Sequence, residues 1–220
     1  MQRIPEPELM NEPAQVLAYA HADFAIPHQY FIDLFRDRFP DLSVKCEVLD
    51  LGCGPGDITR RFATAYPHAV LHGVDGAPNM LAEAERLNRQ AQLANRIHLI
   101  EGRLPQLDLP PQHYQLVINN SLLHHLPDPF VLWDSLRRYA KPCADIFIMD
   151  LMRPASTVMA QQLVEKYAAG EPAILQQDFY HSLCAAFTPE ELQVQLDEAA
   201  LSGLQLEVVS DRHIIIYGSL

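Results

Sequence analysis

The sequence is poor in cysteine and has no long hydrophobic run. Its four cysteines, Cys46, Cys53, Cys143 and Cys184, form no C-x-x-C pair and show no ligand spacing with histidine. They therefore predict neither a disulfide framework nor a structural zinc site, and we expect reduced thiols and no metal. No apolar stretch is long enough to cross a bilayer. The polar, acidic N-terminal segment lacks the apolar core of a signal peptide, so we expect a cytoplasmic protein.

Positive charge is also scarce. The chain has 16 Lys and Arg against 28 Asp and Glu, a formal charge of -12. Such a charge disfavours broad contact with phosphate backbones or anionic lipid, and we expect no nucleic-acid partner. Hydrophobic residues make up 49% and charged residues 20% of the 220 positions, which is an ordinary globular composition. We interpret residues 1–220 as a single domain.

Strand-like and helix-like segments alternate along the middle of the chain. Apolar runs typical of buried strands occupy residues 46–52, 69–76, 96–102, 114–121 and 144–151. Helix-forming stretches occupy residues 57–66, 77–94 and about 128–139. This alternation predicts a parallel sheet with helices on both faces, which is an α/β, doubly wound architecture.

The end of the chain follows a different pattern. Thr188, Pro189 and Glu191 form a capping-box start for a helix. In residues 204–218, two β-rich runs are separated only by a short polar gap, which is too short for a parallel crossover. The sequence therefore predicts a mostly parallel, seven-stranded sheet that ends in a C-terminal antiparallel hairpin.

Two regions fall outside this core. Residues 1–45 contain a pair of amphipathic helices, and residues 152–187 look largely helical. Ligands of open α/β sheets bind beyond the carboxyl ends of the strands, and both regions could reach that edge. We expect an N-terminal helical cap and a helical insertion that together form a lid; the alternative is that they only cover apolar surface.

Glycine is rare, yet Gly52, Gly54 and Gly56 follow the first strand directly. A cluster in this place indicates a sharp turn or a close approach of the backbone to a ligand. The dinucleotide pattern G-x-G-x-x-G is broken, because Asp57 stands at its sixth position. The loop therefore disfavours a nicotinamide dehydrogenase and suits a ligand without a pyrophosphate.

Three segments resemble motifs of one family. They are "VLDLGCGPG" (48–56), "HGVDGAPNML" (72–81) and "YQLVINNSLLHHLPDP" (114–129). They resemble the class I S-adenosylmethionine (SAM)-dependent methyltransferases, in the small-molecule and quinone-type branch. The resemblance covers about residues 45–151 and the terminal hairpin. It implies a Rossmann-like fold, SAM as cofactor and S-adenosylhomocysteine (SAH) as product.

The resemblance assigns roles around the glycine loop. Gly52 and Gly54 would let the backbone approach the methionyl and ribose parts of SAM, and Asp50 would organise the loop near the SAM amino group. Asp75 would accept hydrogen bonds from two ribose hydroxyls, which suits a carboxylate; the alternative is a turn residue. Further implied cofactor contacts are Cys53, Gly56, Gly76, Met80, Asn119, Asn120 and Ser121.

The segment "EGRLPQLDLP" (101–110) departs from the family pattern. Many relatives carry an aspartate here that reaches the adenine amino group, whereas this chain has Arg103, which has no acceptor. We expect backbone amides near Arg103 and Leu104 to contact the adenine. Arg103 itself would stack on the ring or point to solvent.

Two histidines, His124 and His125, follow the fourth strand. Histidine can accept a proton at neutral pH, so both are candidate catalytic bases; the alternative is a packing or capping role. The SAM sulfonium is already a strong electrophile, and a base is needed only when the nucleophile arrives protonated. The catalytic residues therefore stay open.

The acceptor side is the least determined. Tyr19 is the residue that we expect to close over the cofactor. Tentative substrate contacts are Tyr30, Tyr180, His181 and Arg153, of which Arg153 would pair with a substrate carboxylate or phosphate or form a surface ion pair.

The sequence predicts in-line methyl transfer from SAM to a small-molecule substrate. Two alternatives stay open: a non-catalytic SAM-binding partner subunit, and an enzyme that uses SAM for a different group transfer. Neither the acceptor atom nor the oligomeric state is indicated.

Overall fold

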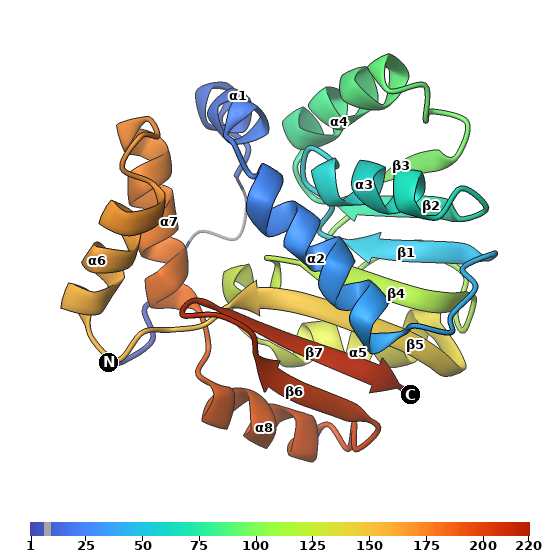
Figure 1. The fold of residues 1–220 in the computed structure, drawn as a ribbon. Coiled ribbons are helices and arrows are strands. Elements are labelled where there is room, and N and C mark those ends of the chain that lie inside the picture. Colours follow the sequence, from blue (N-terminus) through green and yellow to red (C-terminus); the bar gives the residue numbers. More distant parts are fainter. Residues whose placement is uncertain (7–9) are drawn as a thin grey trace.

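One seven-stranded sheet organises the molecule (Figure 1). The computed structural model describes residues 1–6 and 10–220. Within them the strand order is β3-β2-β1-β4-β5-β7-β6. The strands are β1 Glu47–Leu51, β2 Val70–Asp75, β3 Ile97–Glu101, β4 Tyr114–Asn120, β5 Ala140–Leu151, β6 Leu204–Val208 and β7 His213–Ser219. Strands β1 to β5 are parallel, and β7 runs antiparallel to both β5 and β6, which confirms the predicted fold class.

Helices cover both faces of the sheet and one edge. They are α1 Pro13–His21, α2 Ala25–Arg38, α3 Asp57–Ala65, α4 Pro78–Gln90, α5 Phe130–Tyr139, α6 Thr157–Tyr167, α7 Ala173–Ala185 and α8 Pro189–Glu198, with a short 3-10 turn, η1, at Leu123–His125. Helix α8 begins with the predicted capping box between Thr188 and Glu191. No helix in residues 1–6 and 10–220 is long and apolar enough to cross a membrane.

Alternation along the central strands explains why both faces are buried. In β4, Val117 packs into the core layer formed with α5 and α8, whereas Leu116 and Ile118 pack into the layer formed with α2 and α3. Successive side chains of a strand point to opposite faces. A strand that is apolar at both sets of positions must therefore be covered twice, as parallel sheets are.

Strand β5 begins earlier than the sequence predicts. The apolar pattern starts at Ala144, but the strand starts at Ala140, which pairs with Tyr114. The register then shifts, and Cys143 adopts a positive φ of 61°. The irregular, partly polar start hides this part of the strand from a periodicity argument.

The two regions outside the core lie in different places. Helix α2 packs on one face of the sheet, where Phe31 and Phe35 join the buried layer. Helices α6 and α7 form a cluster of their own around Leu163 and Leu183, beside the carboxyl ends of the parallel strands (Figure 1). The covering-helix alternative thus fits α2, and the lid stays a prediction for α1, α6 and α7.

Candidate functional site

The carboxyl ends of β1, β2 and β4 meet around a cavity of about 250 Å³, which we call the loop cavity. This is the edge at which open α/β sheets bind ligands. The predicted cofactor residues that line it are Tyr19, Asp50, Gly52, Cys53, Gly54, Asp75, Gly76, Met80, Arg103, Leu104, Asn120 and Ser121.

Two glycines shape the loop between β1 and α3. Gly52 has a φ of +72°, and a Cβ on it would lie 3.0 Å from the side chain of Leu122. Gly54 has a φ of +52°, and a Cβ on it would meet no atom of the described residues within 4 Å. Only glycine adopts such angles without strain. Gly52 therefore permits the turn, and the missing side chain of Gly54 leaves space beside the backbone in the loop cavity.

Gly56 has a different place. It precedes α3 in a left-handed conformation, and it does not belong to the described lining of the loop cavity. Gly56 therefore serves the start of the helix, and its cofactor contact stays a prediction.

Asp75 ties the ends of two strands together. Its Oδ2 accepts a hydrogen bond from the Gly54 amide and its Oδ1 one from the Ala77 amide, both at 2.8 Å. Burial raises the pKa of this carboxyl although the backbone hydrogen bonds act in the opposite direction. Each oxygen keeps a lone pair for a further donor.

Asp50 is the most deeply buried acid of the loop cavity, with 1% of its surface exposed. Thr59 Oγ1 donates to its Oδ2 at 2.5 Å. Burial raises the pKa of Asp50 to about 7, and the charge of Asp75 acts in the same direction. A cationic group placed beside it would favour the ionised carboxylate.

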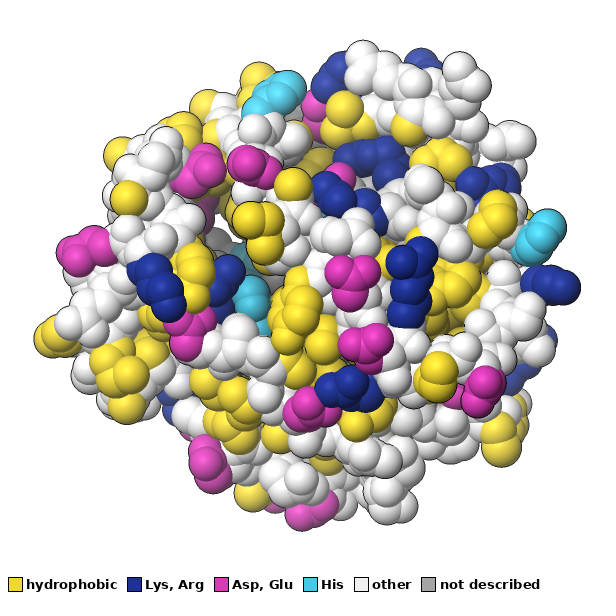
Figure 2. All heavy atoms as spheres, in the orientation of Figure 1, with side chains coloured by type: hydrophobic (Ala, Val, Ile, Leu, Met, Phe, Trp, Pro, Cys, Tyr) yellow, Lys and Arg dark blue, Asp and Glu magenta, His cyan; other side chains and the backbone are white. Residues whose placement is uncertain are grey.

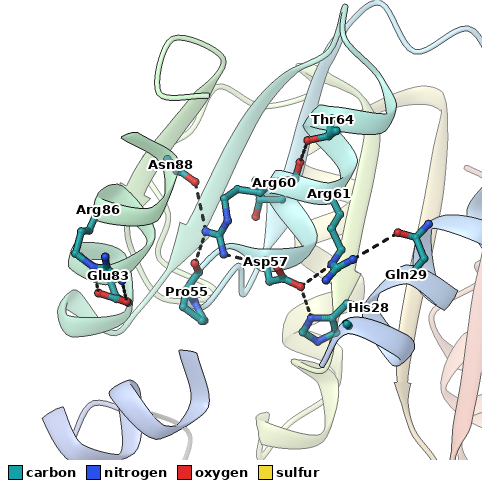
Figure 3. A network of polar contacts seen from close by, with 12 residues as sticks. His28, Gln29, Pro55, Asp57, Arg60, Arg61, Thr64, Glu83, Arg86 and Asn88 are labelled. Carbon is teal, nitrogen blue, oxygen red and sulfur yellow. Dashed lines mark hydrogen bonds and ion pairs between the residues drawn. The ribbon is translucent and has the colours of Figure 1, made fainter. Parts of the chain in front are cut away.

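A network that the sequence did not reveal closes one end of the loop cavity (Figure 3). Asp57 Oδ2 lies 2.7 Å from His28 Nδ1 of α2 and accepts a hydrogen bond from Arg61 Nε at 2.7 Å. Burial would raise the pKa of Asp57, but these two partners hold it below its ordinary range. Arg60 Nη1 donates to the Pro55 carbonyl at 2.7 Å, and its Nη2 lies 3.8 Å from Asp57 Oδ1. The only signal in the sequence was the break that Asp57 makes in the dinucleotide pattern.

The two asparagines of β4, Asn119 and Asn120, have different roles. Asn119 is fully buried, and its amide donates to the Leu51 carbonyl of β1, so it holds two strands together and does not reach the loop cavity. Asn120 and Ser121 follow it and line the loop cavity. They also line a second hollow.

This second hollow, of about 330 Å³, lies between α2, α6, α7 and the turn before β7, and we call it the helical cavity. Figure 2 shows this face of the molecule hollowed left of centre, beside histidine side chains. Its walls include Tyr167, Leu175, Phe179, Arg212 and His213. Sequence reasoning named Tyr167 and Phe179 among the aromatic residues that could face the site. It missed Leu175, Arg212 and His213, because only the folded chain brings the β6–β7 turn under the insertion.

The two cavities share walls. Residues that line both are Met10, Tyr19, Asp23, Phe24, His28, Asn120, Ser121 and His125. Tyr19 stacks near Phe24, with ring centroids 4.9 Å apart, and burial raises the pKa of its hydroxyl to about 12. Tyr19 therefore stands neutral at the junction of the cavities.

The two predicted histidines lie at the wall of the helical cavity. His124 is 2% exposed, and its Nδ1 lies 2.5 Å from Asp150 Oδ1. Burial alone would lower the pKa of His124, but the Asp150 carboxylate outweighs it and raises the pKa. Glu6 Oε1 lies 3.5 Å from His124 Nε2 and 3.1 Å from His125 Nδ1.

The tentative substrate residues lie elsewhere. Arg153 is 7% exposed, pairs with Glu191 and donates to the Ala186 carbonyl. This ion pair fits the alternative to a substrate contact, and the substrate contact stays a prediction. The Tyr30 hydroxyl donates to the Val209 carbonyl at 3.0 Å, which fixes α2 to the sheet. Tyr180 packs into the α6–α7 cluster, and His181 faces solvent. None of these four described side chains lines either cavity.

Comparison with known proteins supports the reading of the central segment. Residues 48–143 match the family described as "Methyltransferase domain". The chain is 33% identical over 117 residues to the trans-aconitate 2-methyltransferase of Streptomyces avermitilis, covering 53% of this chain and 41% of that protein. It is 28% identical over 181 residues to the ubiquinone biosynthesis O-methyltransferase of Xylella fastidiosa, covering 81% of this chain and 68% of that protein. The chain thus spans less than half the length of the Streptomyces relative.

A solved structure shows the same fold. The plantazolicin methyltransferase, in complex with a pentazolic desmethylPZN analogue and SAH, matches with a TM-score of 0.69. The match covers 94% of this chain and 90% of that one at 14% sequence identity. At this identity the likeness is one of fold.

Proposed function

Since this chain belongs to the class I SAM-dependent methyltransferases, we propose that it transfers the methyl group of SAM to a small-molecule acceptor by in-line displacement. The cofactor would occupy the loop cavity, and the acceptor would occupy the helical cavity. The protein's main task in such a reaction is to align the nucleophile with the methyl group and to exclude water.

The shared wall of the two cavities is the observation that carries this proposal. A methyl group that leaves the loop cavity past Asn120 and Ser121 would enter the helical cavity directly. A non-catalytic SAM-binding subunit would need no second cavity at this point. The open acceptor side therefore favours an enzyme.

The chemistry of the loop cavity fits the two ends of SAM. Asp75 would accept the ribose hydroxyls through its remaining lone pairs, and Asp50 would face the amino group of the methionyl part. Arg61 also lines this cavity. Its Nε already donates to Asp57, and the remaining N–H groups of its guanidinium would serve the methionyl carboxylate. Tyr19 would cover the sulfonium, which an aromatic face attracts.

The helical cavity favours a flat, weakly charged acceptor. Phe24, Leu175 and Phe179 supply apolar wall. The cation of this wall, Arg212, already stacks on the ring of Tyr167, with its guanidinium carbon 3.3 Å from the centroid. Acidic side chains also line the cavity, which disfavours a tricarboxylate such as trans-aconitate and suits chemistry nearer to that of ubiquinone biosynthesis.

The test is a transfer assay with methyl-labelled SAM and fractionated small-molecule extracts. We expect the label to appear in a small organic product, together with stoichiometric SAH. The matched control is the Asp75→Ala variant, which should bind SAM more weakly and therefore transfer less label. SAH binding without transfer to any fraction would favour the non-catalytic alternative, and NADH binding without SAH binding would overturn the proposal.

A further inference from the structure

Three side chains from two segments that are far apart in the sequence converge beside the helical cavity, which two of them, His124 and His125, line. Their ligand atoms, one each from Glu6, His124 and His125, all lie within 4.8 Å of one another. Two hydrogen bonds hold the N-terminal segment there: the Ile4 amide donates to the Cys184 carbonyl at 3.0 Å, and the Arg3 side chain donates through Nη2 to the His124 carbonyl at 3.0 Å.

The spacing of these atoms fits a metal ion. In a tetrahedral site with bonds of about 2.1 Å, neighbouring ligand atoms lie about 3.4 Å apart. Here Glu6 Oε1 lies 3.5 Å from His124 Nε2 and 3.1 Å from His125 Nδ1. Two histidines and one carboxylate, with further positions open, are a common donor set for catalytic zinc.

The groups behind the three side chains strengthen this reading. His124 turns its Nδ1 to the buried Asp150 carboxylate at 2.5 Å, so Nδ1 carries the proton and Nε2 is the ring atom directed at Glu6. Metal-bound histidines usually donate their other ring nitrogen to a carboxylate in this way. The Ser182 hydroxyl donates to Glu6 at 3.1 Å, as hydroxyls do that orient a ligating carboxylate.

Charge at the site is also compatible with a divalent cation. The carboxylates that face the cluster are Glu6, Asp150 and Asp178, and the guanidinium of Arg3 faces it too. Three negative charges and one positive charge leave a net charge of -2 with neutral histidines. Asp178 is held in place by Gln15 Nε2 of α1 at 2.9 Å, so this charge belongs to the folded arrangement.

We propose that Glu6, His124 and His125 bind one divalent transition-metal ion, with zinc as the reference ion, and that its open positions face the helical cavity. Such an ion accepts oxygen ligands. If the proposed function holds, the ion would orient an oxygen-bearing acceptor and would favour its deprotonated form. Metal binding itself does not depend on that function.

The test measures metal binding directly, on full-length protein stripped of metal. Zn²⁺ is titrated by calorimetry, and Co²⁺ by its visible absorption, which reports the coordination geometry. We expect one equivalent to bind, with affinity reduced at least about 100-fold in Glu6→Gln and His125→Gln. We expect a reduction of about 10–100-fold in Asp150→Asn, the range for residues that orient a ligand.

Matched controls are His68→Gln and His181→Gln, which remove exposed histidines outside both cavities. These variants should bind Zn²⁺ like the native chain. Equal affinity in Glu6→Gln, His125→Gln and the controls would mean adventitious binding at surface histidines only and would overturn the proposal, as would no stoichiometric binding.

Two further measurements keep the outcomes separate. Thermal unfolding shows whether each variant folds. If Asp150→Asn does not fold, the Zn²⁺ affinities of Glu6→Gln and His125→Gln decide whether the metal site exists. SAH calorimetry on the same samples separates the two proposals, because loss of the metal with SAH binding intact overturns only the metal site.

Discussion

At the scale of single residues, Asp75 has the clearest expected effect on cofactor binding. Its carboxylate holds the Gly54 and Ala77 amides and faces the loop cavity. We expect the native chain to bind SAH with low micromolar affinity, about -8 kcal/mol. Asp75→Ala should lose about 1.5–3 kcal/mol of this, the range for hydrogen bonds to a charged group. Isothermal titration calorimetry measures both.

The matched control for Asp75→Ala is Asp108→Ala, which removes an exposed carboxylate outside the described lining of the loop cavity. It should bind SAH like the native chain. If a folded Asp75→Ala variant bound SAH with unchanged affinity, the proposed ribose contact would be wrong and Asp75 would serve the loop alone.

Asp50 predicts a pH dependence of stability. Burial raises its folded-state pKa to about 7 from an ordinary 3.8. Between these values the folded chain keeps a proton that the unfolded chain releases, so stability falls as pH rises through this window, by up to about 4 kcal/mol. Asp50→Asn should remove this component while keeping an acceptor for Thr59.

Urea unfolding between pH 4.5 and 8, without ligand, checks the Asp50 prediction. The unfolding free energy of Asp50→Asn should rise relative to the native chain as pH increases. Other titrating groups are common to both proteins and cancel in the difference. Parallel pH profiles would show that the Asp50 carboxyl ionises as easily in the folded chain as in the unfolded one.

Residues close together in sequence were the predictable part of the site. Gly52, Gly54 and Asp75 are recognisable in the sequence. The two glycines follow the end of the first strand, and the carboxylate stands at the end of the next strand. Glu6 gives no such signal, since its neighbours His124 and His125 become neighbours only when the N-terminal segment packs beside α7. Arg153 left two alternatives open in the sequence, because a cation just after a strand end looks available to a ligand, whereas the fold pairs it with Glu191.

At the scale of elements, apolar patterns located every strand and most helices. The central strands β1 and β4 are buried at nearly every position, so their apolar runs stand out. The apolar pattern of a helix does not indicate where the helix lies relative to the site. Helix α2 buries an aromatic stripe against the sheet and α1 does not, yet both read as amphipathic helices.

Helices α1, α6 and α7 remain the candidates for a lid. Helix α1 contacts both α4 and α7, and α6 contacts α7. Gln15 of α1 bonds Asp178 of α7, and Asn79 of α4 bonds Asn11, which precedes α1. A site that admits a substrate and then excludes water needs a part that moves. We expect amide hydrogen exchange in these helices to be fast without ligand and slower with SAH.

Exchange in α2 supplies the internal control for the lid, because this helix packs on the sheet and should be slow in both states. Tyr19→Phe separates two roles of the α1 aromatic residue: a contact through the hydroxyl would lower SAH affinity, and a contact through the ring would keep it. If amide exchange in α1, α6 and α7 is slow and does not change when SAH binds, these helices are static covering helices and the lid prediction is wrong.

At the scale of the whole molecule, the site joins segments that no single stretch of chain could supply. The loop cavity takes residues from α1 and α2, from the ends of β1, β2 and β4, and from the segment after β3. The overall charge of -12 does not prevent local cations, and Arg60 and Arg61 line this cavity. Composition therefore disfavoured only broad contact with polyanions, and the fold locates the local charges that would meet a small ligand.

Because distant segments build the cavity, ligand binding should stabilise the molecule as a unit. A ligand that binds only the folded state, at about 100 times its dissociation constant, adds about 2.7 kcal/mol. For a chain of this size the melting temperature should rise by about 5–10 °C. Calorimetric scans with and without SAH should show one transition that shifts, and Asp75→Ala should shift less at equal SAH. Two transitions, of which SAH moves only one, would instead show that the α6–α7 cluster unfolds separately from the sheet.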